Sequence, residues 1–403
     1  MGDAGAVDQT RIAFLRVALL AATIATFALL YVPQAVLPQL ADDFSVSPGA
    51  STLVISTATA GVAVAGIPLA MLSEVVGRRT VMIASLCVAT ASGLLLAAVP
   101  SFTVLLVLRA IQGMALAGVP AVAMAHVADE LQGAALGTSM GIYVAGTTIG
   151  GMSGRIVGGV LGDVAGWRVG LAAVGVLAAV ATVAFAVLLP QPQPRARAAG
   201  PGPARAVVTG LRRALSDPVL YGPYLVAMFG MGAFVAVYNV LPFRLVRPPF
   251  DIPAALASLA FLAYLAGSIT SGIAGGLADR YGRPAVLWVS LALALVGLGL
   301  SVPDVLVTAL VGLVIFTGGF FGAHSVASGW VGTRAPAMAR GPASALYLFA
   351  YYVGSSIGGG IGGAAYGWYG WPTLVAMLAC WLALAAAAVL GAWWLSRRRP
   401  SLR

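Results

Sequence analysis

The chain alternates between long apolar runs and short polar gaps. Most runs hold about 20 residues, which at 1.5 Å per residue matches a hydrocarbon core of about 30 Å. This length and composition predict membrane-spanning helices rather than strands or the helices of a soluble domain. The pattern predicts twelve spans, at residues 14–37, 52–72, 81–99, 103–127, 134–161, 169–189, 219–241, 254–277, 285–300, 305–330, 343–366 and 372–395.

The composition supports this interpretation. Hydrophobic residues make up 60% of the 403 residues and charged residues only 8%, whereas a soluble domain carries about 25% charged residues. A soluble helical bundle of this size would need far more polar surface. The sequence therefore predicts an all-α polytopic membrane protein. Its two cysteines, Cys87 and Cys380, lie inside apolar runs and are too few for a disulfide framework.

Two short polar segments show that the chain is internally doubled. Residues 70–79 (AMLSEVVGRR), the first hinge, and residues 275–284 (GGLADRYGRP), the second hinge, each lie between two predicted spans, and Gly77 and Gly282 are 205 positions apart. A segment rich in proline and arginine separates the two sets of six spans, as expected for a linker. The predicted organisation is a six-helix bundle at 1–190, a cytoplasmic linker at 191–218, a second six-helix bundle at 219–396 and a basic tail at 397–403.

The arginines orient the predicted spans. All 22 basic residues are arginine, which together with abundant alanine indicates a GC-rich bacterial genome. With both termini on one side of the membrane, most arginines fall on that side, and only Arg168, Arg244 and Arg247 fall on the other. Because positive charge is retained in the cytoplasm, we expect a multi-pass protein of the bacterial inner membrane with cytoplasmic N- and C-termini. This placement explains the net charge of +10 without a nucleic-acid partner.

Glycines recur at a spacing of four in two spans, which lets a neighbouring helix approach closely. One interpretation is a packing seam alone, and the other is a seam that also lets spans slide or bend as the two halves rock. The glycines are Gly146, Gly150, Gly154 and Gly158 in the fifth span and Gly354, Gly358 and Gly362 in the eleventh.

The two hinges carry the residues by which the chain resembles the major facilitator superfamily, over nearly its whole length. The family motif is G-x-x-x-D-R-x-G-R-R. The second hinge fits it well, with Gly275, Asp279, Arg280, Gly282 and Arg283. The first hinge has Ala70, Glu74 and Val75 at three motif positions and keeps Gly77, Arg78 and Arg79. The resemblance implies twelve transmembrane helices in two pseudo-symmetric six-helix bundles.

Two further segments narrow the resemblance. The fourth span reads R-x-x-Q-G at Arg109, Gln112 and Gly113, as in proton-coupled members, and the fifth has Arg155 where drug antiporters have proline. Together with residues 151–154, 323–328 and 343–356, this resembles a bacterial arabinose-efflux-type or drug:proton antiporter subgroup. The resemblance implies alternating access to a midplane cavity, hinges that act as cytoplasmic latches, and export driven by inward protons. The Asp279–Arg280 pair implies that the second hinge carries more of the ionic gating.

The intramembrane charges are basic. None of the 12 acidic residues lies in the interior of a predicted span, which disfavours a carboxylate-paired cation site. Arg109 and Arg155 each cost about 2.5–3.5 kcal/mol on insertion scales if unpaired. A facing polar group, a backbone carbonyl, water or an anionic ligand must compensate them. We expect both to serve the substrate or proton pathway, and Arg109→Ala to abolish transport in a protein that still folds.

His324 is the one histidine well inside a predicted span, where it either relays a proton or forms a neutral hydrogen bond between helices. Aromatic and amide side chains from the spans that line the cavity in this family suit a partly apolar solute, although helix packing also explains them. The remaining candidates for the substrate and proton pathway are Gln112, Tyr31, Gln34, Tyr238, Asn239, Tyr347 and Tyr351.

The sequence predicts a secondary transporter rather than an enzyme, because it shows no nucleophile–base or metal-ligand spacing. The expected partners are a small molecule, protons and the lipid bilayer, with no cofactor or metal, and the chain is expected to be a monomer. The solute is a drug-like compound, a sugar or a metabolite. Two alternatives stay open: a proton-independent facilitator or uptake carrier for a neutral or anionic solute, and a membrane receptor or assembly subunit that does not transport.

Overall fold

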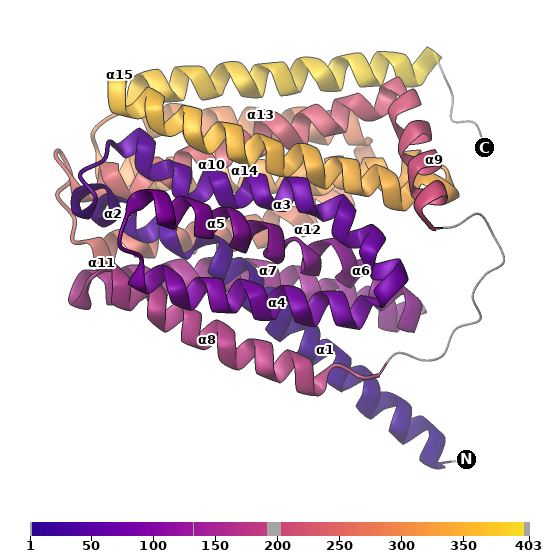
Figure 1. Cartoon of the computed structure of the whole chain (residues 1–403). Helices are drawn as coiled ribbons and strands as arrows, with labels where there is room; N and C mark the ends of the chain where they lie inside the picture. The colour runs from indigo at the N-terminus through magenta and orange to yellow at the C-terminus, as the bar shows by residue number, and fades with distance from the viewer. Residues whose placement is uncertain (1, 132, 192–202, 399–403) are drawn as a thin grey trace.

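The computed structural model describes residues 2–131, 133–191 and 203–398 as a bundle of long helices (Figure 1). Ten of the described helices are long and apolar enough to cross a membrane. Two more spans complete the predicted twelve. They are α7 (Gly133–Ala165), whose glycines and Arg155 lower its hydropathy, and the second part of α15 (Arg340–Arg398), which turns at Gly370.

The first six spans form the N half. Its helices, in chain order, are α1 (Gly2–Tyr31), which continues through a 3-10 turn (Val32–Val36) into α2 (Leu37–Asp43), α3 (Pro48–Val76), α4 (Arg78–Leu95), α5 (Phe102–Leu116), α6 (Gly118–Glu130), α7 and α8 (Trp167–Leu188).

The last six spans form the C half, which follows the short helix α9 (Pro203–Ser216). Its helices are α10 (Tyr221–Val246), α11 (Ala254–Ala257), which continues through a 3-10 turn (Ser258–Ala263) into α12 (Tyr264–Tyr281), α13 (Arg283–Leu300), α14 (Leu306–Arg334) and α15. The predicted linker and tail lie partly outside the described residues, at 192–202 and 399–403.

Prolines and glycines set the breaks between these helices. Gly77 and Gly282 have φ of +96° and +85°, a left-handed conformation that favours glycine; each ends one helix and begins the next. The predicted fourth span is instead two helices that meet at Ala117. Pro120 accounts for this difference, because it has no N–H for the carbonyl oxygen of Leu116.

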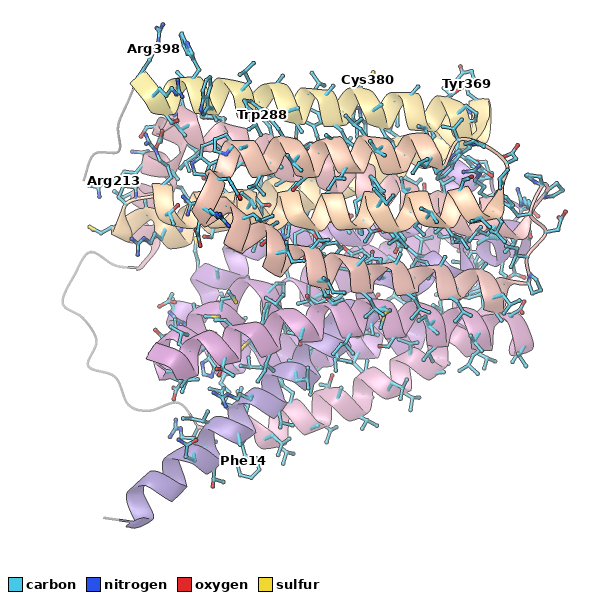
Figure 2. All side chains as sticks on the ribbon, turned by 180° about the vertical axis from the view of Figure 1, so that it is seen from behind. Phe14, Arg213, Trp288, Tyr369, Cys380 and Arg398 are labelled. Atoms are coloured by element: carbon cyan, nitrogen blue, oxygen red, sulfur yellow. The ribbon has the colours of Figure 1, made fainter. Side chains whose placement is uncertain are left out.

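The molecule has two ends, which we name by the turns they hold. The hinge end carries Gly77, Gly282 and α9, and the far end carries Gly370, α2 and α11 (Figure 1). Figure 2 shows Arg213 and Arg398 at the hinge end and Tyr369 at the far end. The two halves pack on each other mainly through α3 against α15 and through α7 against α11 and α12.

Candidate functional site

Arg109 is fully buried in α5 and is held by main-chain oxygens of its own half. Its Nε donates to the carbonyl of Val54 (2.9 Å), and its Nη1 and Nη2 donate to those of Leu29 (3.0 Å) and Leu30 (2.6 Å). The Leu29 carbonyl is available because its usual helical partner would be Pro33, which has no N–H. Arg109 thus satisfies acceptors that the bend in the first span leaves open.

Gln112 completes this group one turn later on α5. Its Oε1 accepts from Arg109 Nη1 at 2.5 Å, and its Nε2 donates to the carbonyl of Ala89 at 3.0 Å. Together the two side chains join α1, α3, α4 and α5. Backbone carbonyls and a facing polar side chain, two of the groups expected to compensate the charge, therefore hold Arg109 within the N half.

Arg155 lies on α7, where the two halves meet. Its Nε donates to Gln34 Oε1 (2.6 Å), its Nη1 to the Gly151 carbonyl (2.5 Å), and its Nη2 to the hydroxyl of Tyr264 (2.9 Å), which belongs to the C half. Three aromatic rings face the guanidinium carbon, with centroids 4.4, 4.7 and 5.2 Å away, in Tyr31, Tyr264 and Phe261. Every described partner of this buried cation is therefore neutral.

Gln34 and Asn239 join the halves next to Arg155. Gln34 Nε2 donates to Asn239 Oδ1 at 2.6 Å, and both residues are fully buried. They are 205 positions apart, the same offset as between Gly77 and Gly282. Equivalent positions of the two halves thus touch each other, which places this pair on the pseudo-two-fold axis of the molecule.

Further contacts between the halves lie toward the far end. Arg247 Nη2 is 3.2 Å from Asp42 Oδ1, a pair with the same offset of 205 positions. The hydroxyl of Ser356 donates to the carbonyl of Ser56 at 2.9 Å. Gly49 faces the backbone of α15 so closely that a Cβ there would lie 2.9 Å from Ala364 Cα. The far end is therefore closed by direct contact.

A cavity of about 750 Å³ lies between the halves on the other side of this contact. Its walls run from His324 and Tyr352, near the middle of the molecule, to Ala70 in the first hinge and Arg340 at the start of α15. The ion pairs described at the hinge end stay within one half. They are Arg11–Glu130, Glu74–Arg78, Arg78–Asp129 and Arg334–Asp217. The cavity thus extends to the hinge end, where the halves are apart.

His324 and two tyrosines form a group in the wall of this cavity. The Tyr347 hydroxyl lies 2.9 Å from His324 Nδ1 and donates to the His324 carbonyl at 3.1 Å. The Tyr351 ring lies 4.9 Å from the imidazole, between centroids. His324 and Tyr347 line the cavity, so the structure brings three of the sequence candidates together.

Tyr238 lies apart from that cavity. Its hydroxyl is 2.7 Å from Thr317 Oγ1, and its ring packs against Phe261 and Tyr264, with centroids 5.7 and 4.9 Å away. It supports the rings that face Arg155. Tyr31, in contrast, contacts Arg155 directly, and its buried hydroxyl faces Ser355.

The two hinges differ in their charge pairing. In the first hinge, Arg78 pairs with Glu74 at 2.7 Å and with Asp129 of α6. Arg79 donates to main-chain oxygens at the end of α8, those of Ala186 (2.9 Å) and Leu189 (3.4 Å).

In the second hinge, Asp279 makes no ion pair or hydrogen bond within the described part of the chain. Arg280 packs over the ring of Tyr281, with 5.1 Å from its guanidinium carbon to the centroid, and Arg283 begins α13. Gly275 faces open space. With the two halves apart at the hinge end, the first hinge forms ion pairs, whereas the second hinge forms none among the described residues.

The two glycine ladders form seams inside each half. A Cβ at Gly150 would lie 2.6 Å from Ile24 Cα, and one at Gly354 would lie 2.7 Å from Met228 Cα. The same faces continue along the helices: Gly146, Gly154 and Gly158 meet Thr23, Ala28 and Val32, and Gly358 and Gly362 meet Gly232 and Ala236. The ladders thus hold α7 against α1 and α15 against α10.

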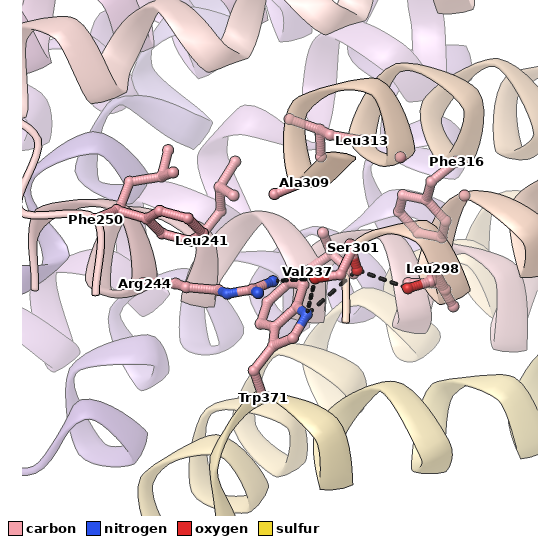
Figure 3. Close-up of a pocket in the computed structure, with 13 residues that line it drawn as sticks. Val237, Leu241, Arg244, Phe250, Leu298, Ser301, Ala309, Leu313, Phe316 and Trp371 are labelled. Atoms are coloured by element: carbon pink, nitrogen blue, oxygen red, sulfur yellow. Dashed lines mark hydrogen bonds between the residues drawn. The ribbon is translucent and has the colours of Figure 1, made fainter. Parts of the chain in front are cut away.

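Sequence reasoning missed a third buried arginine. Arg244 of α10 donates to the Ser301 carbonyl (2.5 Å) and packs over the Trp371 ring, 4.4 Å from its centroid (Figure 3). The neighbouring cavity is only about 10 Å³, so this site joins helices and leaves no space for a solute. The sequence assigned Arg244 to a loop, because the end of its span could be placed only within several residues.

Sequence reasoning also missed the contact of Phe261 with Arg155 and the position of Ser56 beside Asn239. These contacts depend on how the two halves pack against each other. In the part of the chain that the structure describes, no group of three or more His, Cys, Asp or Glu side chains is arranged to hold a metal ion.

The comparisons with known proteins agree with this architecture. The Major Facilitator Superfamily matches residues 19–248 and 245–403. The chain is 38% identical to the inner membrane transport protein YnfM of Escherichia coli (strain K12) over 375 residues, which are 92% of this chain and 89% of that protein. It is 37% identical to the uncharacterized MFS-type transporter YybF of Bacillus subtilis (strain 168) over 368 residues, 91% of this chain and 90% of that protein.

Solved structures share the fold. A bacterial homologue of the human lysosomal transporter Spinster, in an inward-facing and unoccupied conformation, superposes with a TM-score of 0.81 at 16% identity and covers 98% of this chain and 99% of its own. The nucleoside transporter NupG gives a TM-score of 0.76 at 15% identity, over 94% of this chain and 100% of its own. The protein is a multi-pass membrane transporter for small solutes. The chain belongs to the major facilitator superfamily.

Proposed function

We propose that this transporter exports an amphiphilic organic solute from the bacterial cytoplasm by alternating access, in exchange for protons, and that it acts as a monomer. Its N- and C-termini, both hinges and α9 lie on the cytoplasmic side, because the arginines concentrate at that end. The hinge end then faces the cytoplasm, and the far end faces outward.

The observation that carries this proposal is the contrast between the two ends. The cavity of about 750 Å³ is of the size that holds a drug-sized solute, and it extends to the hinge end. The contacts through Gln34, Asn239, Asp42 and Arg247 close the far end. Transport then requires that these contacts break while the hinge end closes.

His324 supports proton exchange. It lies in the cavity wall, and histidine is the side chain whose ordinary pKa lies nearest to neutral pH. Its contact with Tyr347 links its protonation to the first part of α15, which faces the first hinge across the cavity. Solute binding and proton binding can therefore act on the same wall.

A second candidate is a proton-independent carrier for an anionic solute. The buried Arg155, whose described partners are all neutral, favours it. An inside-negative membrane potential would by itself drive an anion outward, so such a carrier needs no titrating group.

Inverted membrane vesicles with an acidified interior separate these candidates. Arabinose, an amphiphilic amine dye and 2-naphthoate are added in turn while a fluorescent probe follows the pH gradient. For the transported solute we expect proton release from the vesicles, and we expect its loss in His324→Gln. An ionophore then collapses the pH gradient. If solute uptake continues at an unchanged rate, this result would contradict proton exchange and favour the second candidate. No uptake of any of the three solutes would count against the export proposal itself.

A further inference from the structure

The surroundings of Arg155 contain more hydrogen-bond donors than acceptors. A guanidinium has five N–H groups, and three of those of Arg155 are paired, with Gln34, Gly151 and Tyr264. All three acceptors are neutral, and no carboxylate contacts Arg155 in the part of the chain that the structure describes. The side chain is only 1% exposed, so water does not screen its charge.

Arg155 also fixes the amides beside it. Because its Nε donates to Gln34 Oε1, the Nε2 of Gln34 must face Asn239, and Asn239 must present Oδ1 in return. This orientation leaves Asn239 Nδ2 buried without an acceptor. An unsatisfied buried donor costs about 1–3 kcal/mol, and the amides cannot be turned to avoid it.

Three hydroxyl groups are also buried without a hydrogen bond of ordinary geometry, although two of them, those of Tyr31 and Ser355, lie close enough to interact with each other. They belong to Tyr31, Ser56 and Ser355, whose side chains are at least nine-tenths buried. Ser56 Oγ and Asn239 Nδ2 lie together, since a Cβ on Gly359 would be 2.7 Å from the first and 2.9 Å from the second. Buried donors are usually paired with protein, water or a ligand, so this place suits a group that accepts hydrogen bonds.

Internal symmetry places a glycine opposite Arg155, and this glycine lets Ser56 and Asn239 pack closely against α15. Gly359 is the position in α15 that corresponds to Arg155 in α7, at the 204-residue offset of the two glycine ladders. One half contributes a guanidinium, and the other contributes no side chain. The cluster adjoins the cavity along α15, because Tyr352, which lines the cavity, lies one turn before Ser355.

We propose that Arg155 binds a carboxylate or a similar oxyanion of the transported solute, with Asn239 Nδ2 and the hydroxyls of Tyr31, Ser56 and Ser355 as further donors. This inference rests on the proposed alternating access and names the solute as an organic anion. A carboxylate accepts hydrogen bonds at both oxygens and donates none, so it matches the excess of donors. In binding, it draws the guanidinium away from Gln34 and Tyr264. It thereby weakens the contact of Arg155 with Tyr264, which joins the two halves, and this couples solute binding to opening.

Thermal unfolding of the purified chain in detergent tests this inference with matched probes. The probes are benzoate, 2-naphthoate and decanoate, each beside its neutral amide. We expect at least one carboxylate to raise the unfolding temperature of the wild type while its amide does not. We expect Arg155→Gln to weaken the apparent affinity for that carboxylate by about tenfold or more, as for loss of a charge-assisted hydrogen bond. Arg397→Gln, which removes the same charge from the exposed end of α15, controls for net charge and is expected to keep the wild-type affinity.

Tyr31→Phe keeps the test decisive if Arg155→Gln does not fold. The variant keeps the ring that packs over Arg155, so we expect it to fold and to bind the carboxylate with lower affinity. The inference would be overturned if no carboxylate stabilised the protein, or if an acid and its amide stabilised it equally. It would also be overturned if both variants kept the wild-type affinity. If the vesicles transport only neutral or cationic solutes, the inference fails and export stands. If they transport nothing, the proposed function fails.

Discussion

The N half buries two arginines within the membrane spans, and these two arginines have different kinds of hydrogen-bond partner. Arg109 is enclosed by main-chain carbonyls and by Gln112, all within one half. Arg155 is held by side chains and aromatic rings that come from both halves. Carbonyl groups of packed helices do not move apart when the halves rock, whereas side chains across the interface do. The partners of a buried charge therefore decide whether it stabilises the fold or takes part in the transport cycle.

The largest expected effect is that of Arg109→Ala, which we expect to prevent folding. The substitution leaves the carbonyls of Val54, Leu29 and Leu30 without this donor in a dry interior, and it lowers the free energy of unfolding by about 3 kcal/mol or more. The measurement is the yield of monodisperse protein from size-exclusion chromatography, together with its thermal unfolding. A wild-type yield of folded but inactive protein would show that Arg109 serves transport instead.

Arg155→Gln is expected to have the reverse outcome. Flux of the transported anion falls by about tenfold or more, since a charge-assisted contact is lost, while the yield of folded protein stays near that of the wild type. Vesicle flux and chromatography measure both quantities on one preparation. If Arg155→Gln loses folded protein as severely as Arg109→Ala, the contrast between the two arginines disappears.

Gln34→Glu sharpens the comparison by giving Arg155 an acidic partner. Gln34 Oε1 already lies 2.6 Å from Arg155 Nε, so a carboxylate there forms a buried ion pair and competes with the solute. We expect a higher unfolding temperature and flux reduced several-fold. Gln39→Glu adds the same charge on α2, which follows the turn that holds Gln34, and controls for it. Unchanged flux in Gln34→Glu, measured in the same vesicles, would argue against an anion site at Arg155.

The smallest effect concerns the hinges. Glu74–Arg78 is an i, i+4 pair in a partly exposed position, and such pairs contribute about 0.3–0.5 kcal/mol. We expect Glu74→Gln to leave flux nearly unchanged. Asp279 has no ion-pair partner among the described residues while the hinge end is apart, which suits a latch that engages only on closure, so Asp279→Asn is expected to slow flux more. Equal losses in the two variants would contradict this difference.

The twelve spans and their doubling could be predicted from the sequence, because hydropathy and the repeated hinge do not depend on tertiary contacts. The break at Ala117 could not be placed, since Pro120 can either kink a helix or divide it. The two arginines could not be told apart. The partners of Arg109 are main-chain carbonyls, which carry no sequence signal, and those of Arg155 lie up to 121 positions away. Only the 205-residue offset between Gln34 and Asn239 pointed to the contact on the axis.

The most direct test of the different roles of these arginines is the ¹⁵N NMR spectrum of arginine side chains in the labelled, full-length chain. Arg109→Lys and Arg155→Lys assign the two Nε–H signals, and 2-naphthoate is then titrated against 2-naphthamide as the control. We predict that the Arg155 signal shifts with the carboxylate alone, while the Arg109 signal stays in place. An Arg155 signal that stays fixed, or one that moves together with that of Arg109, would contradict the account.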